Sequence, residues 1–373
     1  MENKKTKKEI LVVLGTRPEA IKLFPVILEL RERDIDVTVV ATGQHTDLVY
    51  EVFEETGIFP DIEFSAIEHS VGFANSSLPY ILDKLDGILD CVRPDAVIVQ
   101  GDTSSALAGA LFAFNHGIKL AHVEAGLRTY QKEPYPEEAN RQIISRIADY
   151  HFCPTELTHN NLTIEMVGGN KYVVGNTEID AMYYALDCCT PKKGYKSLED
   201  MPSIIVTLHR RESIGVPMRN VCRDIVEIAN STAVDIIVTK HPNPGVSEII
   251  ESELGDVELL SNSSIMVVPP MDFVSFVHQM AKSTLIITDS GGVQESASAL
   301  GVPVVIARDT TDRPEALESS ILAGTNKGGV YTATMSLLTS ATKYDKLSHA
   351  ACPFGDGSAA KQIVNIMAEE LCM

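Results

Sequence analysis

Acidic side chains in the first half of the chain stand where they could transfer protons to and from a substrate. Asp102 and Glu124 each follow a short apolar run, and Glu137 and Glu138 come further on. Paired carboxylates can serve as an acid and a base once their surroundings separate their pKa values. The alternative for Asp102 is a helix cap before Thr103, and for the adjacent pair a first helical turn favoured by the helix dipole. Spacing alone leaves both interpretations open.

A glycine-rich turn and a basic side chain could bind a diphosphate. The stretch TDSGGVQES (288–296) places Ser290, Gly291 and Gly292 between an expected strand and an expected helix, where free backbone N–H groups favour an anion. Arg17 stands at another helix start, held there by Pro18, and a guanidinium can bind a phosphate through two hydrogen bonds. The alternatives are a plain N-cap and an exposed arginine. Further cations at strand ends favour the anion site.

His209 could donate a hydrogen bond to a leaving diphosphate. It follows an expected strand and precedes Arg210, Arg211 and Glu212. A lone histidine is more often structural, but one beside two arginines at a phosphate-type site is a credible donor. The other polar strand ends are Gly43-Gln44-His45, His241 and Arg308-Asp309. Ligands of open parallel sheets bind beyond the carboxyl ends of the strands, so these residues predict a cleft between two lobes.

The elements that must position these residues alternate between β-rich and helical runs. The β-rich runs begin near residues 10, 37, 96, 119, 150 and 172, and again near 203, 234, 265, 284 and 301. This alternation predicts βαβ units and parallel sheets. The polar run 192–203 resembles a linker, so we expect one Rossmann-like domain at 1–190 that carries the carboxylates and a second at 191–357 that binds the anion. Residues 358–373 predict an amphipathic helix, N-capped by Ser358, that packs back onto the first domain.

Length and composition bound the class of protein. A chain of 373 residues with 45% hydrophobic and 22% charged residues is expected to form two globular domains. The net charge of −20 disfavours nucleic acid and anionic membranes as partners. No run has the length of a membrane span and the basic start lacks an export-signal pattern, so we expect a cytoplasmic protein. Seven cysteines without a CxxC pattern argue against disulfides and a thiolate zinc site, and we expect them to be reduced and buried.

Common catalytic and cofactor motifs do not fit the chain. GDGSAA (355–360) has the spacing of a dinucleotide-binding loop, but no apolar strand precedes it and too few residues follow it for a βαβ unit. The Walker A, HExxH and GxSxG patterns are absent from the sequence. We therefore do not expect dinucleotide, P-loop, zincin or α/β-hydrolase chemistry.

Ten motifs occur together in one order: GTRPEAIK, TGQH, GDTSSALAGALFAF, HVEAGLRT, PYPEEANRQ, GNTEIDA, HRRES, TDSGGVQE, RDTTDRPEA and PFGDG. With them the sequence resembles the non-hydrolysing UDP-N-acetylglucosamine 2-epimerases over nearly its whole length. The resemblance implies an α/β, glycosyltransferase-B type fold, with two Rossmann-like domains whose parallel sheets face a central cleft. It also implies reversible conversion of UDP-N-acetylglucosamine to UDP-N-acetylmannosamine without a cofactor or metal. In the family, UDP is eliminated to give a 2-acetamidoglucal and is then added back.

The family's functional residues can be carried over position by position. Asp102, Glu124 and Glu137 match its catalytic carboxylates, and His209 matches its catalytic histidine near the diphosphate. The residues expected to bind the UDP-sugar are Arg17, Lys22, Gln44, His45, Arg141, Arg210, His241, Ser290, Gly291, Gly292, Glu295, Ser296 and Arg313. Which carboxylate serves which face of the sugar stays open. The expected ligands are UDP-N-acetylglucosamine and UDP, and we expect a homodimer with no nucleic-acid or membrane partner.

Two positions depart from the family pattern. The family usually reads QEEA at residues 294–297, and its second glutamate is expected to hold the ribose hydroxyls, whereas this chain has Ser296. Serine is shorter and uncharged, so a strong ribose contact is in doubt. Bacterial members also carry a Gly-Gln pair that contributes to a second, regulatory substrate site, where this chain has Val71-Gly72. Regulation by substrate is therefore also in doubt.

Related activities remain as alternatives. The closest is C2 epimerisation of a UDP-2,3-diacetamido sugar, although those relatives tend to lose the Arg-Pro-Glu that this chain keeps at 313–315. Hydrolysing epimerases, which release free N-acetylmannosamine, typically lack the TRPEAIK and PEEANR patterns present here. A glycosyltransferase of the same fold would need a ribose-binding glutamate and no cluster of carboxylates. A nucleotide-sugar binding module without catalysis would lose the carboxylates that this chain retains.

Overall fold

The computed structural model describes residues 7–44, 47–66, 77–191, 203–210, 213–241, 243–255, 257, 259, 263–311 and 313–372. It divides into two compact units: unit 1 comprises Met1–Tyr184 and Phe354–Met373, and unit 2 comprises Ala185–Pro353. The boundaries expected at 190/191 and 357/358 fall a few residues after these divisions. Several residues named above lie outside the described part, namely His45, Val71-Gly72, Arg211, Glu212 and linker residues 192–202.

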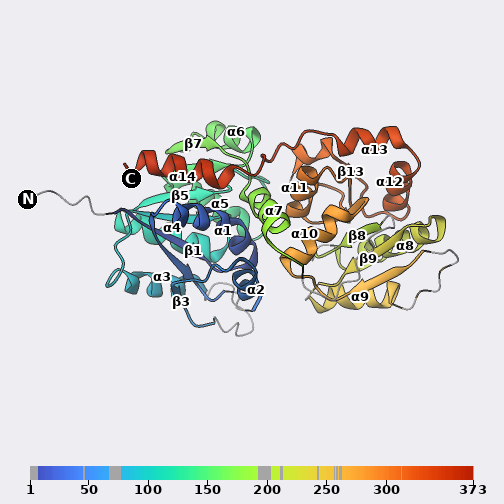
Figure 1. The fold of residues 1–373 in the computed structure, drawn as a ribbon, viewed down its shortest axis with the longest axis horizontal. Helices are drawn as coiled ribbons and strands as arrows, with labels where there is room; N and C mark the ends of the chain where they lie inside the picture. Colours follow the sequence, from blue (N-terminus) through green and yellow to red (C-terminus); the bar gives the residue numbers. More distant parts are fainter. Residues whose placement is uncertain are drawn as a thin grey trace, which may run out of the picture. The chain divides into compact units, whose positions relative to one another are not determined.

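Unit 1 alternates strands and helices along the chain (Figure 1). Its strands are β1 (Glu9–Leu14), β2 (Asp36–Ala41), β3 (Ile62–Glu63), β4 (Ala96–Gln100), β5 (Lys119–Val123), β6 (Tyr150–Cys153) and β7 (Asn170–Val173). Its helices are α1 (Arg17–Glu32), α2 (Asp47–Thr56), α3 (Ser77–Ile88), α4 (Ser104–His116), α5 (Glu137–Ile147), α6 (Glu156–Ile164) and α14 (Ala359–Glu370), while α7 (Thr177–Cys188) crosses the division between the units.

Unit 2 repeats the alternation. Its strands are β8 (Ser203–Thr207), β9 (Asp235–Thr239), β10 (Ile265–Val268), β11 (Leu285–Thr288), β12 (Val304–Ile306) and β13 (Ser320–Leu322). Its helices are α8 (Val216–Ser231), α9 (Pro244–Leu254), α10 (Phe273–Lys282), α11 (Gly291–Leu300), α12 (Gly329–Leu338) and α13 (Ala341–Ser348), with the 3₁₀ helix η3 (Pro314–Glu318) before β13.

Both sheets are parallel wherever the structure describes their strands, which confirms the expected α/β class. The strand order is β3-β2-β1-β4-β5-β6-β7 in unit 1 and β10-β9-β8-β11-β12-β13 in unit 2. The central strands β1, β4, β8 and β11 are rich in Val, Ile and Leu, as expected where helices cover both faces of a parallel sheet and leave little surface to solvent. Chain order reverses direction between β1 and β4, and again between β8 and β11. These are the topological switch points at which such sheets bind ligands.

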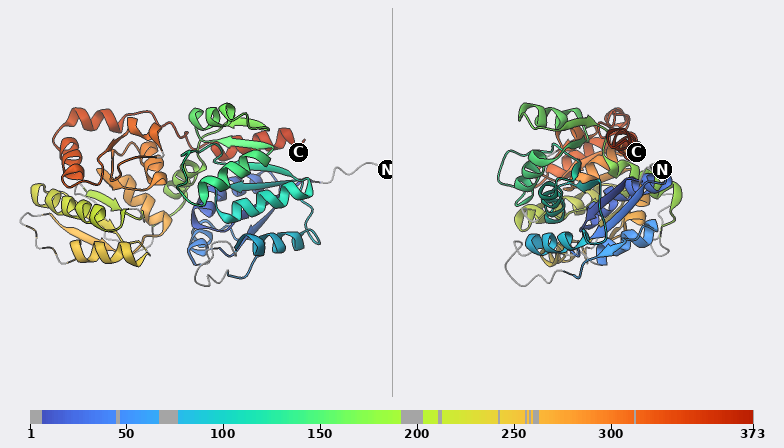
Figure 2. Two further views of the ribbon diagram at one scale, coloured as in Figure 1. Left: turned by 180° about the vertical axis from the view of Figure 1, so that it is seen from behind. Right: turned by 90° about the vertical axis from the view of Figure 1, so that its left-hand side faces the viewer.

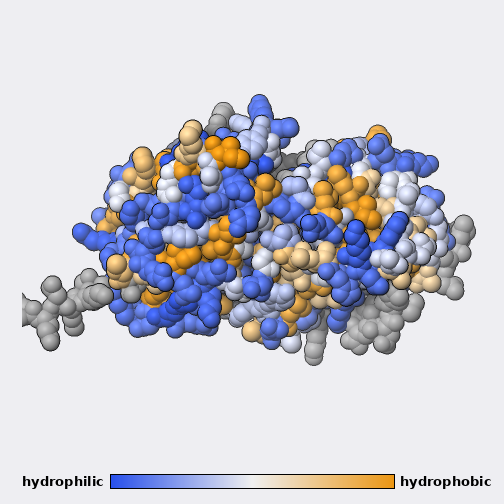
Figure 3. All heavy atoms as spheres, turned by 90° about the horizontal axis from the view of Figure 1, so that it is seen from above, coloured by the Kyte–Doolittle hydropathy of each residue, from blue (hydrophilic) through white to orange (hydrophobic). Residues whose placement is uncertain are grey.

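Each sheet is buried between layers of helices. In unit 1, Leu11, Val13 and Val99 pack in one apolar cluster with side chains of α3 and α4, while α1 contacts α2 and α14. In unit 2, strands β8, β9 and β11 share a cluster with α8, α9 and α12. On the face drawn in Figure 3, the surface of each unit is mostly hydrophilic and is interrupted by hydrophobic patches.

The last helix returns to unit 1, far in sequence from the strands beside it (Figures 1 and 2). Helix α14 contacts α1, and its first two backbone N–H groups, of Ala359 and Ala360, donate to the carboxylate of Asp180 on α7 at 3.3 and 2.8 Å. Ser358 occupies the N-cap position, as expected, but its side chain makes no capping hydrogen bond. The cap therefore comes from a residue far away in the sequence.

Two short strands and the cysteines depart from expectation. Strands β3 and β13 were not anticipated, because two and three residues are too few for a periodic pattern. None of the seven cysteines is paired in a disulfide, but the expectation that they are buried is wrong for most of them. Only Cys153 and Cys222 are buried, while Cys91, Cys188 and Cys372 are exposed.

Candidate active site

The switch point of unit 1 brings two helix starts together. Arg17 is the first residue of α1, with Pro18 in its first turn, and α4 follows Asp102 and Thr103. Thr103 is the N-cap of α4, since its hydroxyl accepts the N–H of Ala106 at 3.1 Å. The capping role considered for Asp102 therefore belongs to Thr103, which leaves the Asp102 carboxylate available for other contacts.

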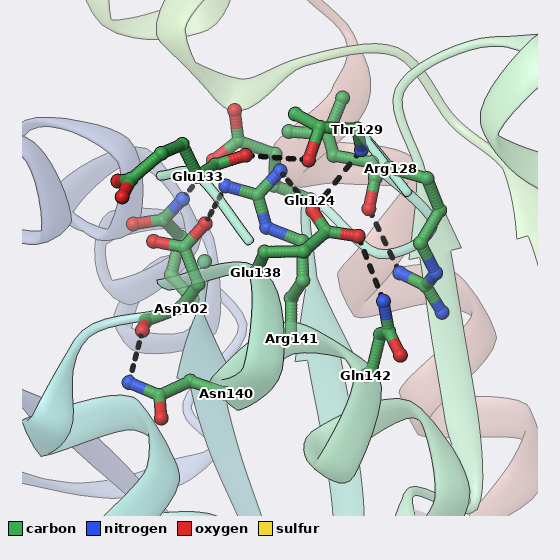
Figure 4. Close-up of polar contacts among 12 residues, drawn as sticks. Asp102, Glu124, Arg128, Thr129, Glu133, Glu138, Asn140, Arg141 and Gln142 are labelled. Atoms are coloured by element: carbon green, nitrogen blue, oxygen red, sulfur yellow. Dashed lines mark hydrogen bonds and ion pairs between the residues drawn. The ribbon is translucent and has the colours of Figure 1, made fainter. Parts of the chain in front are cut away.

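Asp102 is held from several sides (Figure 4). Its carboxylate forms an ion pair with Arg141 of α5, and its carbonyl accepts the side-chain amide of Asn140 at 2.8 Å. The preceding carbonyl, of Gly101, accepts a hydrogen bond from Nε2 of His122 at 2.7 Å. Burial raises the pKa of Asp102, Arg141 opposes the shift, and the charges of Glu124 and Glu137 raise it further. The three predicted carboxylates therefore lie close enough to influence one another.

Glu124 follows β5 in a left-handed backbone conformation, with a φ of 63°. Such a conformation is uncommon outside glycine and costs about 1–3 kcal/mol, a strain that concentrates at functional sites. Lys22 of α1 donates to one carboxylate oxygen at 2.7 Å, and the amide of Gln100 donates to the other. Lys22 also lies 3.4 Å from the carboxylate of Glu178 on α7. The side chain of Glu124 is thus fixed by groups from α1 and β4, and Glu178 of α7 contacts the same lysine.

The adjacent glutamates of α5 have separate environments. Both lie in its first turn, as the alternative interpretation expected. Glu138 is buried and accepts the backbone N–H groups of Thr129 and Tyr130 at 3.0 and 3.2 Å, so it shapes the loop after β5 (Figure 4). Glu137 is partly exposed, and its charge acts on Asp102. Glu137 is therefore the better candidate for chemistry.

The switch point of unit 2 is built around His209 and Asp289. Asp289 directly follows β11, and its carboxylate accepts the backbone N–H groups of His209 and Arg210 and the ring Nδ1 of His209 at 2.7 Å. Burial raises the pKa of Asp289, but hydrogen bonds and the charge of His209 outweigh it, so the pKa lies below its usual range. An ionised Asp289 orients the imidazole and directs Nε2 away from itself. The ring of His241 lies 5.8 Å from that of His209, measured between centroids.

The start of α11 has the features of an anion site. Ser290 is its N-cap, but the hydroxyl makes no capping hydrogen bond, so the plain-cap alternative does not describe this side chain. Gly291 and Gly292 form the first turn. A Cβ atom at Gly291 would lie 3.6 Å from the guanidinium carbon of Arg313, an ordinary van der Waals distance, so this cation lies beside the helix start.

Further along α11, the side chains expected near the ribose are buried. Glu295 forms an ion pair with Arg313, and only 1% of the Glu295 side chain is exposed. Ser296 is also buried. Gln294 accepts the hydroxyl of Thr311 at 2.9 Å. Glu295 and Arg313, both expected to bind substrate, thus bind each other in this structure.

The structure brings the predicted site residues together in separate groups within each unit. Gln44 follows β2 and accepts the hydroxyl of Ser105 at 2.7 Å. The structure therefore brings Lys22, Asp102, Glu124 and Arg141 together in unit 1. It brings His209, Arg210 and His241 together in unit 2, and joins Glu295 with Arg313 near Gly291.

Sequence reasoning missed several supporting residues. Gln100, Asn140 and Glu178 contact predicted site residues and carried no usable local signal. Asp289 was predicted only as a polar residue after a strand, and its contact with His209 was not foreseen. In the described ranges, no cluster of three or more His, Cys, Asp and Glu has the arrangement of a metal site. Those ranges also hold no helix with the length and apolar character needed to cross a membrane.

Two parallel α/β sheets in one chain, each with polar groups at its switch point, define a protein of the glycosyltransferase-B type. The same fold occurs in a sucrose-phosphate synthase from Thermosynechococcus elongatus, with a TM-score of 0.63 and 12% identity over 98% of this chain and all of that one. A family model described as UDP-N-acetylglucosamine 2-epimerase matches residues 28–368. The chain therefore belongs to the UDP-N-acetylglucosamine 2-epimerase family, which confirms the resemblance inferred from its motifs.

Individual members of the family are similar over the whole chain. A UDP-N-acetylglucosamine 2-epimerase from Bacillus subtilis is 39% identical over 96% of this chain and 94% of its own. The crystal structure of UDP-GlcNAc 2-epimerase from Neisseria meningitidis bound to UDP-GlcNAc matches with a TM-score of 0.90 and 34% identity, covering 97% of this chain and all of that one.

Proposed function

We propose that this protein interconverts UDP-N-acetylglucosamine and UDP-N-acetylmannosamine, as a non-hydrolysing 2-epimerase. The observation that carries the proposal is the group of Asp102, Glu124 and Glu137 at the switch point of unit 1, where burial and mutual charge raise the pKa of Asp102. Solved relatives bound to UDP-GlcNAc support the choice of substrate.

The chemistry needs an elimination because C2 of the sugar is not next to a carbonyl. The C1–O bond breaks and its electrons leave with UDP, while a carboxylate removes the C2 proton and the C1–C2 double bond of a 2-acetamidoglucal forms. Protonation of C2 from the opposite face and return of UDP to C1 give the epimer. Asp102, Glu124 and Glu137 are the proposed acid–base groups, each expected to contribute about 10²–10⁴ in rate.

The leaving diphosphate requires cations and hydrogen-bond donors. In the proposed complex, His209 donates from Nε2 while Asp289 holds its Nδ1, and Arg210 and Arg17 neutralise charge. The backbone N–H groups at the start of α11, at Ser290, supply a further anion site. Lys22 and Arg141 keep two of the carboxylates in place by direct contact.

The test is incubation with UDP-N-acetylglucosamine alone, followed by proton NMR of the anomeric region. Growth of UDP-N-acetylmannosamine to an equilibrium mixture is the expected result. Release of free N-acetylmannosamine would instead indicate hydrolysis, and turnover of only a 2,3-diacetamido analogue would indicate the alternative substrate. In deuterated water, early product should carry deuterium at C2, because a carboxylate exchanges its proton with solvent.

We also propose that the protein is a homodimer and acts in the cytoplasm. The free cysteines support a reducing compartment. Light scattering after size-exclusion chromatography, compared with the chain mass of 40.6 kDa, tests the dimer. Fractionation of the source cells tests the location.

A further inference from the structure

Glu19 is a buried carboxylate that the proposed chemistry does not use. It lies in the first turn of α1 with 0% of its surface exposed, and it has no ion pair with any described residue. Its Oε2 accepts the backbone N–H groups of Gly15 at 3.0 Å and Thr16 at 2.7 Å. A side chain at this helical position often accepts from the N-cap backbone, so these two bonds are explained by capping.

The other carboxylate oxygen reaches beyond the helix. Oε1 of Glu19 accepts the hydroxyl of Thr103 at 2.6 Å, although the two residues are 84 positions apart. Thr103 follows Asp102 directly and caps α4 through the N–H of Ala106. Glu19 therefore links the start of α1, which carries Arg17, to the start of α4, which carries Asp102. These helices follow β1 and β4, the two strands of the switch point.

We propose that Glu19 is a positioning residue that holds the Asp102 loop against the Arg17 loop without touching the substrate. This inference rests on the proposed function of Asp102 and deepens it. Other contacts fix Gly101, the Asp102 carbonyl and the Asp102 carboxylate, and all of them come from β5 and α5. Glu19 holds the same loop from the side of α1, the helix that carries Arg17.

The carboxylate itself supports a role beyond capping. Glutamine at this position completes the same helix cap, so capping alone does not require a buried charge. Burial raises the pKa of Glu19 to about 7, and the hydrogen bonds from Thr103, Thr16 and Gly15 act in the opposite direction. Three donors converge on Glu19, and only a carboxylate accepts from all of them with both oxygens.

The first variant is Glu19→Gln. Its amide oxygen can keep the two backbone bonds of α1, while its NH₂ group faces Thr103 and cannot accept from the hydroxyl. We expect kcat for the epimerisation to fall about 10- to 100-fold, because small displacements of reacting groups carry costs of that order. KM and the Kd for UDP should change less than about threefold, because the Arg17 loop keeps its cap.

Thr103 supplies the other half of the test. Thr103→Ser keeps the hydroxyl and should retain kcat, whereas Thr103→Val removes it together with the cap of α4 and should lower kcat at least as far as Glu19→Gln does. The double variant with Glu19→Gln and Thr103→Val should be no slower than Thr103→Val alone, because that change already breaks the link to Glu19. Multiplying effects in the double variant would overturn the proposal, as would a wild-type kcat in Glu19→Gln.

Asp224→Asn is a matched control for loss of a buried carboxylate that caps a helix. Asp224 is 1% exposed and accepts the N–H groups of Gly328 at 2.8 Å and Tyr331 at 3.1 Å at the start of α12. This variant should lower thermal stability and leave kcat unchanged. If it slows turnover as much as Glu19→Gln does, the effect is general destabilisation and the proposal fails.

A readout without turnover separates the inference from the proposed function. Amide exchange of residues 101–107 should speed up in Glu19→Gln and stay unchanged in Asp224→Asn. If the wild type does not epimerise UDP-N-acetylglucosamine, the proposed function fails, while faster exchange at 101–107 still supports the link. Unchanged exchange at 101–107 overturns the link whatever the activity.

Discussion

The two sheets place an aspartate at the same topological position, and the pKa values of the two aspartates shift in opposite directions. Asp102 follows the second strand of the switch point in unit 1, and Asp289 does so in unit 2. The pKa of Asp102 is raised by burial and by neighbouring carboxylates, whereas the pKa of Asp289 is lowered by the hydrogen bonds and charge of His209 in spite of burial. The fold thus determines where each aspartate lies, and the neighbouring groups determine the direction in which its pKa shifts.

The difference extends beyond these two residues. In unit 1, burial also raises the pKa of Glu19 to about 7 and of Asp180 to about 6. These two acids can gain or lose a proton near neutral pH, and the pKa of Asp102 is raised in the same direction. The acid at the switch point of unit 2 stays ionised and orients a donor. This difference is consistent with the proposed roles, in which unit 1 transfers protons and unit 2 stabilises the leaving group.

The largest expected effect comes from removing the unit 1 carboxylates. Asp102→Asn, Glu124→Gln and Glu137→Gln should each lower kcat by about 10²–10⁴ while UDP affinity measured by calorimetry stays near that of the wild type. Glu156→Gln is a matched control, because Glu156 is the exposed first residue of α6 as Glu137 is the first of α5. Near-normal turnover in all three variants would remove the carboxylate mechanism.

Stability should depend on pH through Asp180. A folded-state pKa of about 6, above the unfolded value of about 4, means that the folded protein binds the proton more tightly, so stability is lost as pH rises through this window. The loss is of the order of 3 kcal/mol. Amide exchange of α14, corrected for its intrinsic pH dependence, should accelerate between about pH 4 and 6. The acceleration should be smaller in Asp180→Asn, because this variant cannot ionise. Equal acceleration in both proteins would assign the dependence to another group.

A smaller effect is expected from Asp289→Asn. The variant keeps the shape but loses the charge that orients His209, and removal of such outer partners typically costs about 10- to 100-fold. We expect kcat to fall by that factor, with little further loss when His209→Ala is added. Asp235→Asn is the control. Asp235 is the first residue of β9, accepts a hydrogen bond from the hydroxyl of Ser264 and lies away from the switch point. If the effects of Asp289→Asn and His209→Ala on kcat multiply in the double variant, Asp289 does not act through His209.

The smallest effect concerns Ser296. If its hydroxyl contacts ribose, Ser296→Ala should weaken UDP binding about two- to tenfold, the value of one neutral hydrogen bond. Binding of 2′-deoxy-UDP should change less. Calorimetry with both nucleotides measures the difference, and equal losses would place the ribose contact elsewhere in unit 2.

Local patterns were sufficient for the elements and for the positions of most chemical groups. Runs of Val, Ile and Leu predict buried parallel strands, and polar residues directly after them predict the strand ends where Asp102 and Glu124 lie in unit 1 and His209 lies in unit 2. The start of α1 and the start of α11 were also predictable, because Pro18 and the Ser-Gly-Gly turn are local signals. Strands β3 and β13 were not predictable, because two or three residues are too few to show a periodic pattern.

The sequence by itself determined which residues stand at strand ends and, through ten ordered motifs, which family the chain belongs to. Only the tertiary structure decided which of those residues meet. Lys22 and Glu124 are 102 positions apart, and His209 and Asp289 are 80 apart. Periodicity places a side chain on a face of its own element, but contact between elements depends on strand order, register and burial. Those same contacts set the pKa values, so the pKa values of Asp102 and Asp289 shift in opposite directions only in the folded protein.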